Sequence, residues 1–294
     1  MNAISRPWDL YFPQARQWSR VDGSKPPVPD ALFVRVDAQV TPIHILGSFR
    51  RIQAVWVGHA AQGDVELLAD FASLTSVSLV APRLTSLAPL RALRRLQALE
   101  LDDPLTLSGL DSLSDLKCLV LRHFRRIRSL SLVEPLSRLR VLSMSTIPSW
   151  DASRRCLEVD SFEPCSRLSG LESLCLMGVR PLKGRLEPLQ RLVSLKYLHI
   201  SHVYQFELED YAALARALPN ASGHCLQPYY ALPHLGLRCK RCGEEMVFLT
   251  GPRPRTRHQL CPKCHKHKLE GHVQLWNDAV QGGWGSRSHS RYDG

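Results

Sequence analysis

Four cysteines near the C-terminus are the residues with the clearest potential for chemistry. Cys239, Cys242, Cys261 and Cys264 form two C-x2-C pairs that are separated by eighteen residues. Two residues between ligands let a tight turn aim both sulfurs at one ion, and this spacing is typical of structural zinc sites. Four thiolates complete the tetrahedral shell of zinc and leave no position for a catalytic water. We therefore predict one structural Zn²⁺ and no catalytic metal.

The residues around these pairs predict a small metal-held domain. Gly243 follows the first pair, where a knuckle turn favours positive φ, and His265 takes the equivalent place after the second pair. The stretches 243–250 and 255–260 flank a Gly-Pro-Arg-Pro sequence and predict a β-hairpin. Residues 237–268 resemble the zinc-ribbon family. That resemblance implies a structural metal, and it allows nucleic-acid binding, protein binding or a capping role.

The remaining five cysteines lack pair spacing, as expected in a reducing compartment. Cys118 and Cys175 fall at outward strand positions, so each is either an exposed thiol or a small apolar residue of a repeat, and we favour the second reading. The sequence has no phosphate-binding glycine loop, no H-E-x-x-H and no G-x-S-x-G motif. We predict no catalytic residues and expect a protein that is not an enzyme.

Composition places the 294-residue chain among ordinary globular proteins. Hydrophobic residues make up 44% and charged residues 22%, and no stretch reaches the length and apolarity of a membrane-spanning helix. The N-terminus has no apolar core of a secretory signal, so we expect a cytoplasmic protein without a membrane partner. The net charge is +11, and residues 236–294 carry eleven Lys and Arg against five Asp and Glu. A basic C-terminal part favours anionic partners.

An internal repeat organises the middle of the chain. The template L-x-x-L-x-L recurs, with conservative replacements, from residues 52, 74, 96, 116, 139, 171 and 195. All spacings but one lie between 20 and 24 residues, and the exception is 32. Each copy predicts one short strand whose apolar side chains must be buried by stacking against the neighbouring copies. Pro-Leu pairs at 89–90, 135–136 and 188–189 predict short helical turns on the return path.

Residues 50–226 resemble the short leucine-rich repeats of internalins and of cytosolic phosphatase regulators. The resemblance implies an α/β solenoid, a right-handed horseshoe with a parallel β-sheet, followed here by the small C-terminal zinc ribbon. The chain departs from the family at the asparagine that usually follows the strand, so we expect apolar packing in these turns. The 32-residue spacing marks an insertion of about nine residues, either a surface loop beside a binding face or an irregular packed loop.

The resemblance also suggests boundaries. We predict an N-terminal segment and cap at 1–50, the repeat domain at 51–226, the ribbon with its flanking segment at 237–280, and a disordered tail at 281–294. A strand is expected within 29–39 and a helix at 207–218. After the ribbon, we expect Val273, Leu275 and Trp276 to pack back on the folded part.

Outward positions of the strands give the candidate binding residues. Aromatic and arginine side chains are enriched where interfaces gain most of their energy. The candidates on the concave face are Trp56, Arg122, His123, Tyr197, His199 and His202. The leading hypothesis is an adaptor that binds a protein partner there. The alternative is a nucleic-acid-binding protein whose ribbon holds phosphates through Arg253, Arg255 and Arg257.

Overall fold

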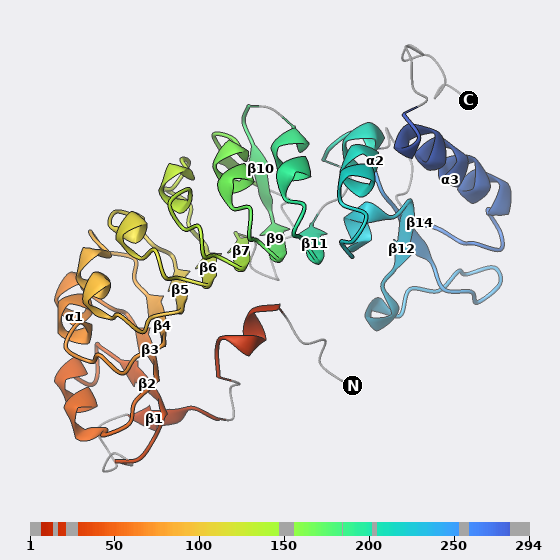
Figure 1. The fold of residues 1–294 in the computed structure, drawn as a ribbon. Coiled ribbons are helices and arrows are strands. Elements are labelled where there is room, and N and C mark those ends of the chain that lie inside the picture. The colour runs from red at the N-terminus through yellow and green to blue at the C-terminus, as the bar shows by residue number, and fades with distance from the viewer. Residues whose placement is uncertain are drawn as a thin grey trace. The chain divides into compact units, whose positions relative to one another are not determined.

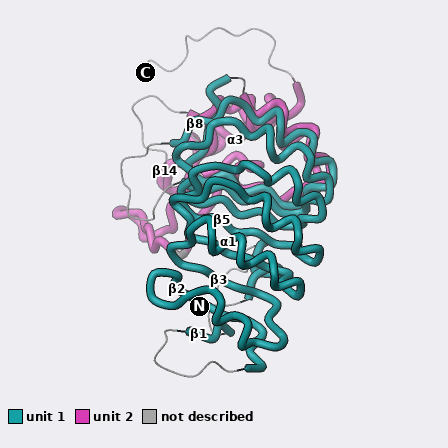
Figure 2. The backbone as a smooth tube through the Cα atoms, turned by 90° about the vertical axis from the view of Figure 1, so that its left-hand side faces the viewer, with its two compact units in different colours: residues 1–183 teal, residues 184–294 magenta. Residues whose placement is uncertain are grey.

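The computed structural model describes residues 7–13, 17–21, 29–146, 156–183, 185–201, 205–252 and 259–282. The chain divides into two compact units, residues 1–183 and residues 184–294 (Figure 2). The boundaries predicted from the sequence at 1–50, 51–226, 237–280 and 281–294 remain a proposal, and residues 283–294 lie outside the described ranges.

The first unit is built on a parallel sheet whose strands follow one another in chain order (Figure 1). This arrangement confirms the predicted α/β solenoid. β2 is the strand expected within 29–39, and β1, which the sequence did not reveal, pairs with it in parallel. The strands are β1 (Ser19–Val21), β2 (Phe33–Asp37), β3 (Ala54–Gly58), β4 (Ser76–Val80), β5 (Ala98–Asp102), β6 (Cys118–Arg122), β7 (Val141–Ser145) and β9 (Ser173–Met177).

Short helical turns return the chain from one strand to the next. Pro89 lies in the first turn of η4, as its fixed φ favours, and Leu90 of that turn is fully buried. The predicted turn at Pro135 is displaced, because η6 ends two residues before it. The return elements are η3 (Ile43–Ser48), α1 (Gln62–Leu68), η4 (Ala88–Ala92), η5 (Leu110–Ser112), η6 (Ser131–Val133) and η7 (Glu163–Arg167).

The core of the first unit consists of side chains stacked in columns. Leu99, Leu119, Leu142 and Leu174 are register partners on successive strands, and each is fully buried. A second column runs two residues further along each strand through Leu101, Leu121, Met144 and Leu176. The predicted burial of apolar side chains by stacking is confirmed for these four strands, and Leu198, at the same template position of the final copy, is buried in the second unit.

Backbone hydrogen bonds extend the pairing of neighbouring repeats into the turn after each strand. The amides of Ala60, Ala81, Asp103 and His123 each donate to the last residue of the next strand at 2.8–3.0 Å. Three of the turn residues, His59, Asp103 and His123, adopt φ values of 51–53°, a conformation in which Asp and His are enriched among non-glycine residues. The expected apolar packing is present at Ala60, Phe124 and Val179, which are buried, whereas Pro82 is exposed.

The insertion contributes one strand of a second, two-stranded sheet. β8 (Leu157–Val159) pairs in parallel with β10 (Val179–Pro181). Phe162 and Cys165 are fully buried and Cys156 is half-buried, so this part of the insertion is packed. Trp150 lies outside the described residues.

The second unit combines the last repeat with the cysteine-rich part. β11 (Tyr197–Ile200) carries the final copy of the template, and α2 (Leu208–Ala217) is the helix expected at 207–218. The turn η8 (Glu187–Arg191) contains the predicted Pro188-Leu189 pair, and η9 (His224–Leu226) follows α2. β12 (Tyr229–Ala231), β13 (Val247–Leu249) and β14 (Gln259–Leu260) form an antiparallel sheet, with η10 (Pro233–Leu235) after β12. The predicted hairpin is therefore present as β13 and β14.

A helix that the sequence did not predict completes the second unit. α3 (Lys266–Val280) begins two residues after Cys264 and packs against α2. Its buried face carries Leu269, His272, Trp276 and Ala279, and the Nε2 atom of His272 lies 2.8 Å from the carbonyl oxygen of Pro228. Trp276 is buried as expected, whereas Val273 and Leu275 are only half-buried.

Candidate functional site

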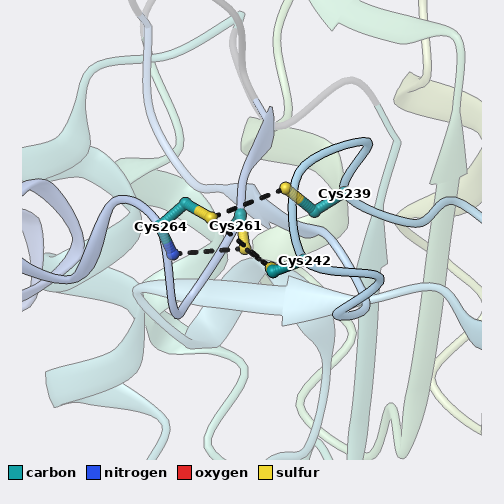
Figure 3. Close-up of side chains that lie close together, drawn as sticks. All are labelled: Cys239, Cys242, Cys261 and Cys264. Atoms are coloured by element: carbon teal, nitrogen blue, oxygen red, sulfur yellow. Dashed lines mark hydrogen bonds between the residues drawn. The ribbon is translucent and has the colours of Figure 1, made fainter.

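The four cysteine sulfurs converge on one point of the second unit (Figure 3). All four Sγ atoms lie within 4.8 Å of one another. The Cys242 sulfur lies 3.4 Å from those of Cys261 and Cys264, and the sulfurs of Cys239 and Cys264 are 3.8 Å apart. A disulfide needs about 2.05 Å. Four sulfurs at about 2.3 Å from a tetrahedral zinc are about 3.8 Å apart, so the cluster fits such an ion.

Two different turns deliver the sulfur pairs. Cys239 and Cys242 lie on a knuckle closed by a hydrogen bond from the Gly243 amide to the Cys239 carbonyl oxygen, and Gly243 has φ +75° as predicted. Cys261 directly follows β14, and Cys264 leads into α3. His265 has φ −122°, so the expected positive φ is wrong. The reason is that this residue precedes the first turn of α3 instead of closing a second knuckle.

The electrostatics of the cluster favour a bound cation. Hydrogen bonds from the backbone amides of Arg241 and Cys242 lower the pKa of the Cys239 thiol to about 6. The neighbouring sulfur of Cys242 raises the pKa of the Cys264 thiol to about 12. Four adjacent thiolates repel one another strongly unless a positive ion lies between them. A divalent metal removes this conflict, since metal ligation deprotonates the coordinating thiols.

The concave face of the first unit is formed by the outward positions of the strands. One outward column contains only small or β-branched residues and is almost completely buried on β5, β6 and β7. Cys118 belongs to this column and is fully buried. Cys175 on β9 lies in the next outward column and is 4% exposed. The interpretation of both as small apolar residues is therefore favoured over exposed thiols. The members of the column are Ala54, Ser76, Ala98, Cys118, Val141 and Ser173.

A polar network lies further along the same strands. Glu100 on β5 accepts a hydrogen bond from the Ser78 hydroxyl at 2.7 Å and forms an ion pair with the Nε atom of Arg122 at 2.6 Å. At the ends of the same strands, the Nδ1 atom of His123, which follows β6, lies 2.6 Å from the carboxylate of Asp102, the last residue of β5. Two of the predicted binding residues, Arg122 and His123, are thus fixed side by side by acidic partners on β5.

Trp56 occupies an equivalent outward position near the start of the sheet. The guanidinium of Arg35, its register partner on β2, lies 3.9 Å from the centre of the indole ring. A Cβ atom on Gly58 would approach that ring to 2.8 Å, so the glycine makes room for the indole to lie flat on the sheet. Sequence reasoning missed Arg35, whose place in β2 becomes informative only once its pairing with β3 is known.

Comparisons with known proteins report similar folds at low identity. No protein-family model and no curated protein matches the sequence. Among solved structures, internalin C2 and a second internalin of Listeria monocytogenes are 18% and 16% identical, with TM-scores of 0.37 and 0.39 over 57% and 63% of this chain. A leucine-rich-repeat protein of Leptospira interrogans is 15% identical, with a TM-score of 0.43 over 65% of this chain. The matches cover 69%, 57% and 47% of those chains.

The decisive observation comes from the chain itself. Successive copies of the L-x-x-L-x-L template form successive parallel strands whose leucines share one register. The first unit has a leucine-rich-repeat fold. None of its helices in the described ranges is long and apolar enough to cross a membrane.

An N-terminal segment covers part of the concave face of this leucine-rich-repeat fold. Trp8, Tyr11 and Phe12 pack against Ala98, Cys118, Val120 and Val141, which are outward residues of β5, β6 and β7. Sequence analysis missed this contact. The available signal was a cluster of aromatic residues between Pro7 and Pro13, in a region without any repeat.

The other predicted binding residues lie in different places. Tyr197 and His199 are half-buried on β11 of the second unit. His202, Arg253, Arg255 and Arg257 lie outside the described residues. His267, one of the histidines near the cysteines, is exposed, and its Nδ1 atom lies 3.6 Å from the carboxylate of Glu270.

His199 predicts an acid-sensitive second unit. Burial and the nearby His224 lower its pKa from 6.5 to about 4. Between these two pH values His199 binds a proton in the unfolded chain but not in the folded chain. The free energy of unfolding should therefore fall as the pH decreases from about 6.5 to about 4. Each pKa unit of difference corresponds to about 1.4 kcal/mol. In urea unfolding between pH 7 and pH 4, the free energy of unfolding of His199→Gln should depend less steeply on pH than that of the wild type. An equal pH dependence of the two proteins would contradict the assignment.

Proposed function

We propose that this protein is a non-enzymatic adaptor that recognises a protein partner through its concave face. The supporting observation is the combination of Trp56 with Arg35 and of Arg122 with Glu100 on outward strand positions. Aromatic and arginine side chains held rigidly on a scaffold lose little conformational entropy when a partner binds. The predicted contacts at His123, Tyr197, His199 and His202 belong to the same proposal.

The four-cysteine cluster is proposed to hold one structural Zn²⁺. Thiolates are the preferred ligands of this soft ion, and a complete set of four leaves no open coordination position. The apolar core beside the cluster is small: Val247, Leu249, Leu260 and Leu269, with Ala231 against them. When bound, the ion would crosslink the two turns, while Gly243 and the amides of the knuckle hold the sulfurs in place.

A cytoplasmic location fits the state of the thiols. None of the nine cysteines, all of which lie in the described ranges, forms a disulfide. Thiol-rich chains without disulfides are typical of reducing compartments.

Nucleic-acid binding by the ribbon is the second candidate. Exposed basic side chains surround both turns, including Lys240, Arg241, Lys263 and Lys266. However, the ring of Phe248, the one aromatic residue between the cysteine pairs, stacks on the ring of Tyr230 with 5.6 Å between the ring centroids. The ring is therefore already stacked within the chain, whereas base stacking needs an available aromatic face. The proposed arginine contacts at Arg253, Arg255 and Arg257 would supply a phosphate-dominated, salt-sensitive interaction.

Photo-crosslinking tests which surface recognises the partner. A photoreactive amino acid at Ser145, at the outward end of β7, is expected to capture a protein from native extract. The matched control replaces Leu67, an exposed residue of the return helix α1. The captured protein is then purified and tested for direct binding to the full chain. Equal capture at both positions, or capture of nucleic acid alone, would overturn the proposal.

A further inference from the structure

The N-terminal segment binds the concave face through one side of a single turn. Residues Pro7–Leu10 form the 3-10 turn η1, and the amides of Tyr11 and Phe12 both donate to the Trp8 carbonyl oxygen, at 2.9 and 3.3 Å. Spacings of three and four residues place these three aromatic side chains on the same side. Leu10 points away from them and is 85% exposed. The short red turn is visible on the concave side of the strands in Figure 1.

The sheet receives the aromatic side chains on a surface of small residues. Ala98, Cys118 and Val141 are neighbours in one outward column, and Val120 lies in the next. All four are at most 5% exposed, although they point away from the leucine core. The Ser76 hydroxyl adds a hydrogen bond of 2.8 Å to the carbonyl oxygen of Tyr11. This surface is therefore an apolar receptor with a polar edge, and the segment fills it.

The environment of Tyr11 combines partial burial with nearby charged groups. Burial raises the pKa of its hydroxyl, with smaller contributions from Cys118 and Glu172 and an opposing one from Arg140. Arg140 and Glu172 precede β7 and β9 and form an ion pair at 3.7 Å. Tyr11 thus lies between the small-residue column and a charged rim.

The N-terminal segment contacts the sheet mainly through side chains, as a bound peptide would. The described residues 7–13 form no strand of the sheet, and they contact it through side chains projecting from a helical turn. Helical segments that bind grooves through residues at i, i+3 and i+4 are a recurrent mode of peptide recognition. Being covalently tethered, the segment has an effective concentration that is typically in the millimolar range for a short linker.

We propose that the N-terminal segment is a tethered competitor, and that the partner binds this surface with a helical turn carrying aromatic side chains at i, i+3 and i+4. The proposal rests on the concave face being the recognition surface. The chain's own segment shows the chemistry that the surface accepts: aromatic rings above Ala98, Cys118 and Val141, with a carbonyl oxygen toward Ser76. The partner's affinity is then reduced by the fraction of molecules whose surface is already filled.

A peptide of residues 6–14 tests the proposal in the full-length chain. The triple variant Trp8→Ala, Tyr11→Ala, Phe12→Ala should bind the fluorescently labelled peptide at least tenfold more tightly than the wild type. Leu10→Ala, which changes the exposed side of the same turn, should behave as the wild type. A peptide with alanine at the three aromatic positions should not bind. Alkylation of Cys118, followed by mass spectrometry, should rise at least tenfold in the triple variant and stay low in Leu10→Ala.

Several results would overturn the proposal. A folded triple variant with a reactive Cys118 that does not bind the peptide would show that the surface is no peptide receptor. If the triple variant unfolds, Tyr11→Ala is used instead. An unfolded Tyr11→Ala, or a folded one without gain in peptide binding, would make the segment a permanent part of the core.

The two proposals can fail separately. Peptide binding to the opened surface, without any partner at Ser145, would contradict the adaptor function but support the receptor surface. A partner that binds the wild type and the triple variant equally would support the adaptor function and contradict the competitor.

Discussion

Replacing Cys261 by serine is expected to abolish metal binding and to unfold the region between the two cysteine pairs. The variant should contain less than about 0.1 zinc per chain, against about one for the wild type. Structural zinc contributes on the order of 10 kcal/mol to folding in small domains. The four buried apolar side chains beside the cluster contribute about 6–12 kcal/mol, which the conformational entropy lost on ordering the region offsets. Elemental analysis and amide hydrogen exchange measure the two effects, and exchange should become fast in β13 and β14.

The control for this prediction is Lys263→Ser, an exposed residue between Cys261 and Cys264. It introduces the same side chain into the same turn without removing a sulfur. Slow exchange that persists in Cys261→Ser would mean that the ribbon folds without its metal, contrary to the small size of its core.

Truncating Leu119 is expected to cost about 2–5 kcal/mol in the free energy of unfolding. Leu119 is fully buried between Leu99 and Leu142, so its removal leaves a cavity in the middle of the column. Neighbouring strands are tied by their backbone ladder and cannot collapse freely into the space. Urea unfolding followed by circular dichroism gives the difference.

The same chemical change at Leu67 provides the comparison. Leu67 is 44% exposed on α1, so Leu67→Ala should change the free energy of unfolding by about 0.5 kcal/mol or less. Equal destabilisation by the two variants would contradict the assigned register of the leucine column.

The elements that could be predicted from the sequence are those with a local signal. The template L-x-x-L-x-L fixes which leucines point inward, so the strands and the column of Leu99, Leu119, Leu142 and Leu174 followed from spacing alone. The two C-x2-C pairs likewise predicted the convergence of four sulfurs, because the spacing within each pair is set by the geometry of a turn.

The features that were missed depend on contacts between distant parts of the chain. Nothing around Tyr11 indicates that it lies beside Ser76 and Cys118, which are far away in sequence. For the same reason, the burial of the outward residue Val120 beside the N-terminal segment was not predicted. α3 was missed because Gly271 and a basic first turn weaken its local helix signal, whereas packing against α2 stabilises it.

The central claim is that the concave face, and not the basic ribbon, makes the main contact with the partner. The most direct test is the dissociation constant of the purified partner for two full-length variants. Trp56→Ala combined with Arg122→Ala should weaken binding by about 100-fold, since each removes an anchor of the type that dominates interfaces. Replacing Arg253, Arg255 and Arg257 by glutamine should change the dissociation constant by less than about threefold, and the dissociation constant should depend only weakly on salt. The opposite result would contradict the account: the arginine variant loses binding and the concave-face variant keeps it. If the affinity also fell steeply with salt, a nucleic-acid ligand would be favoured.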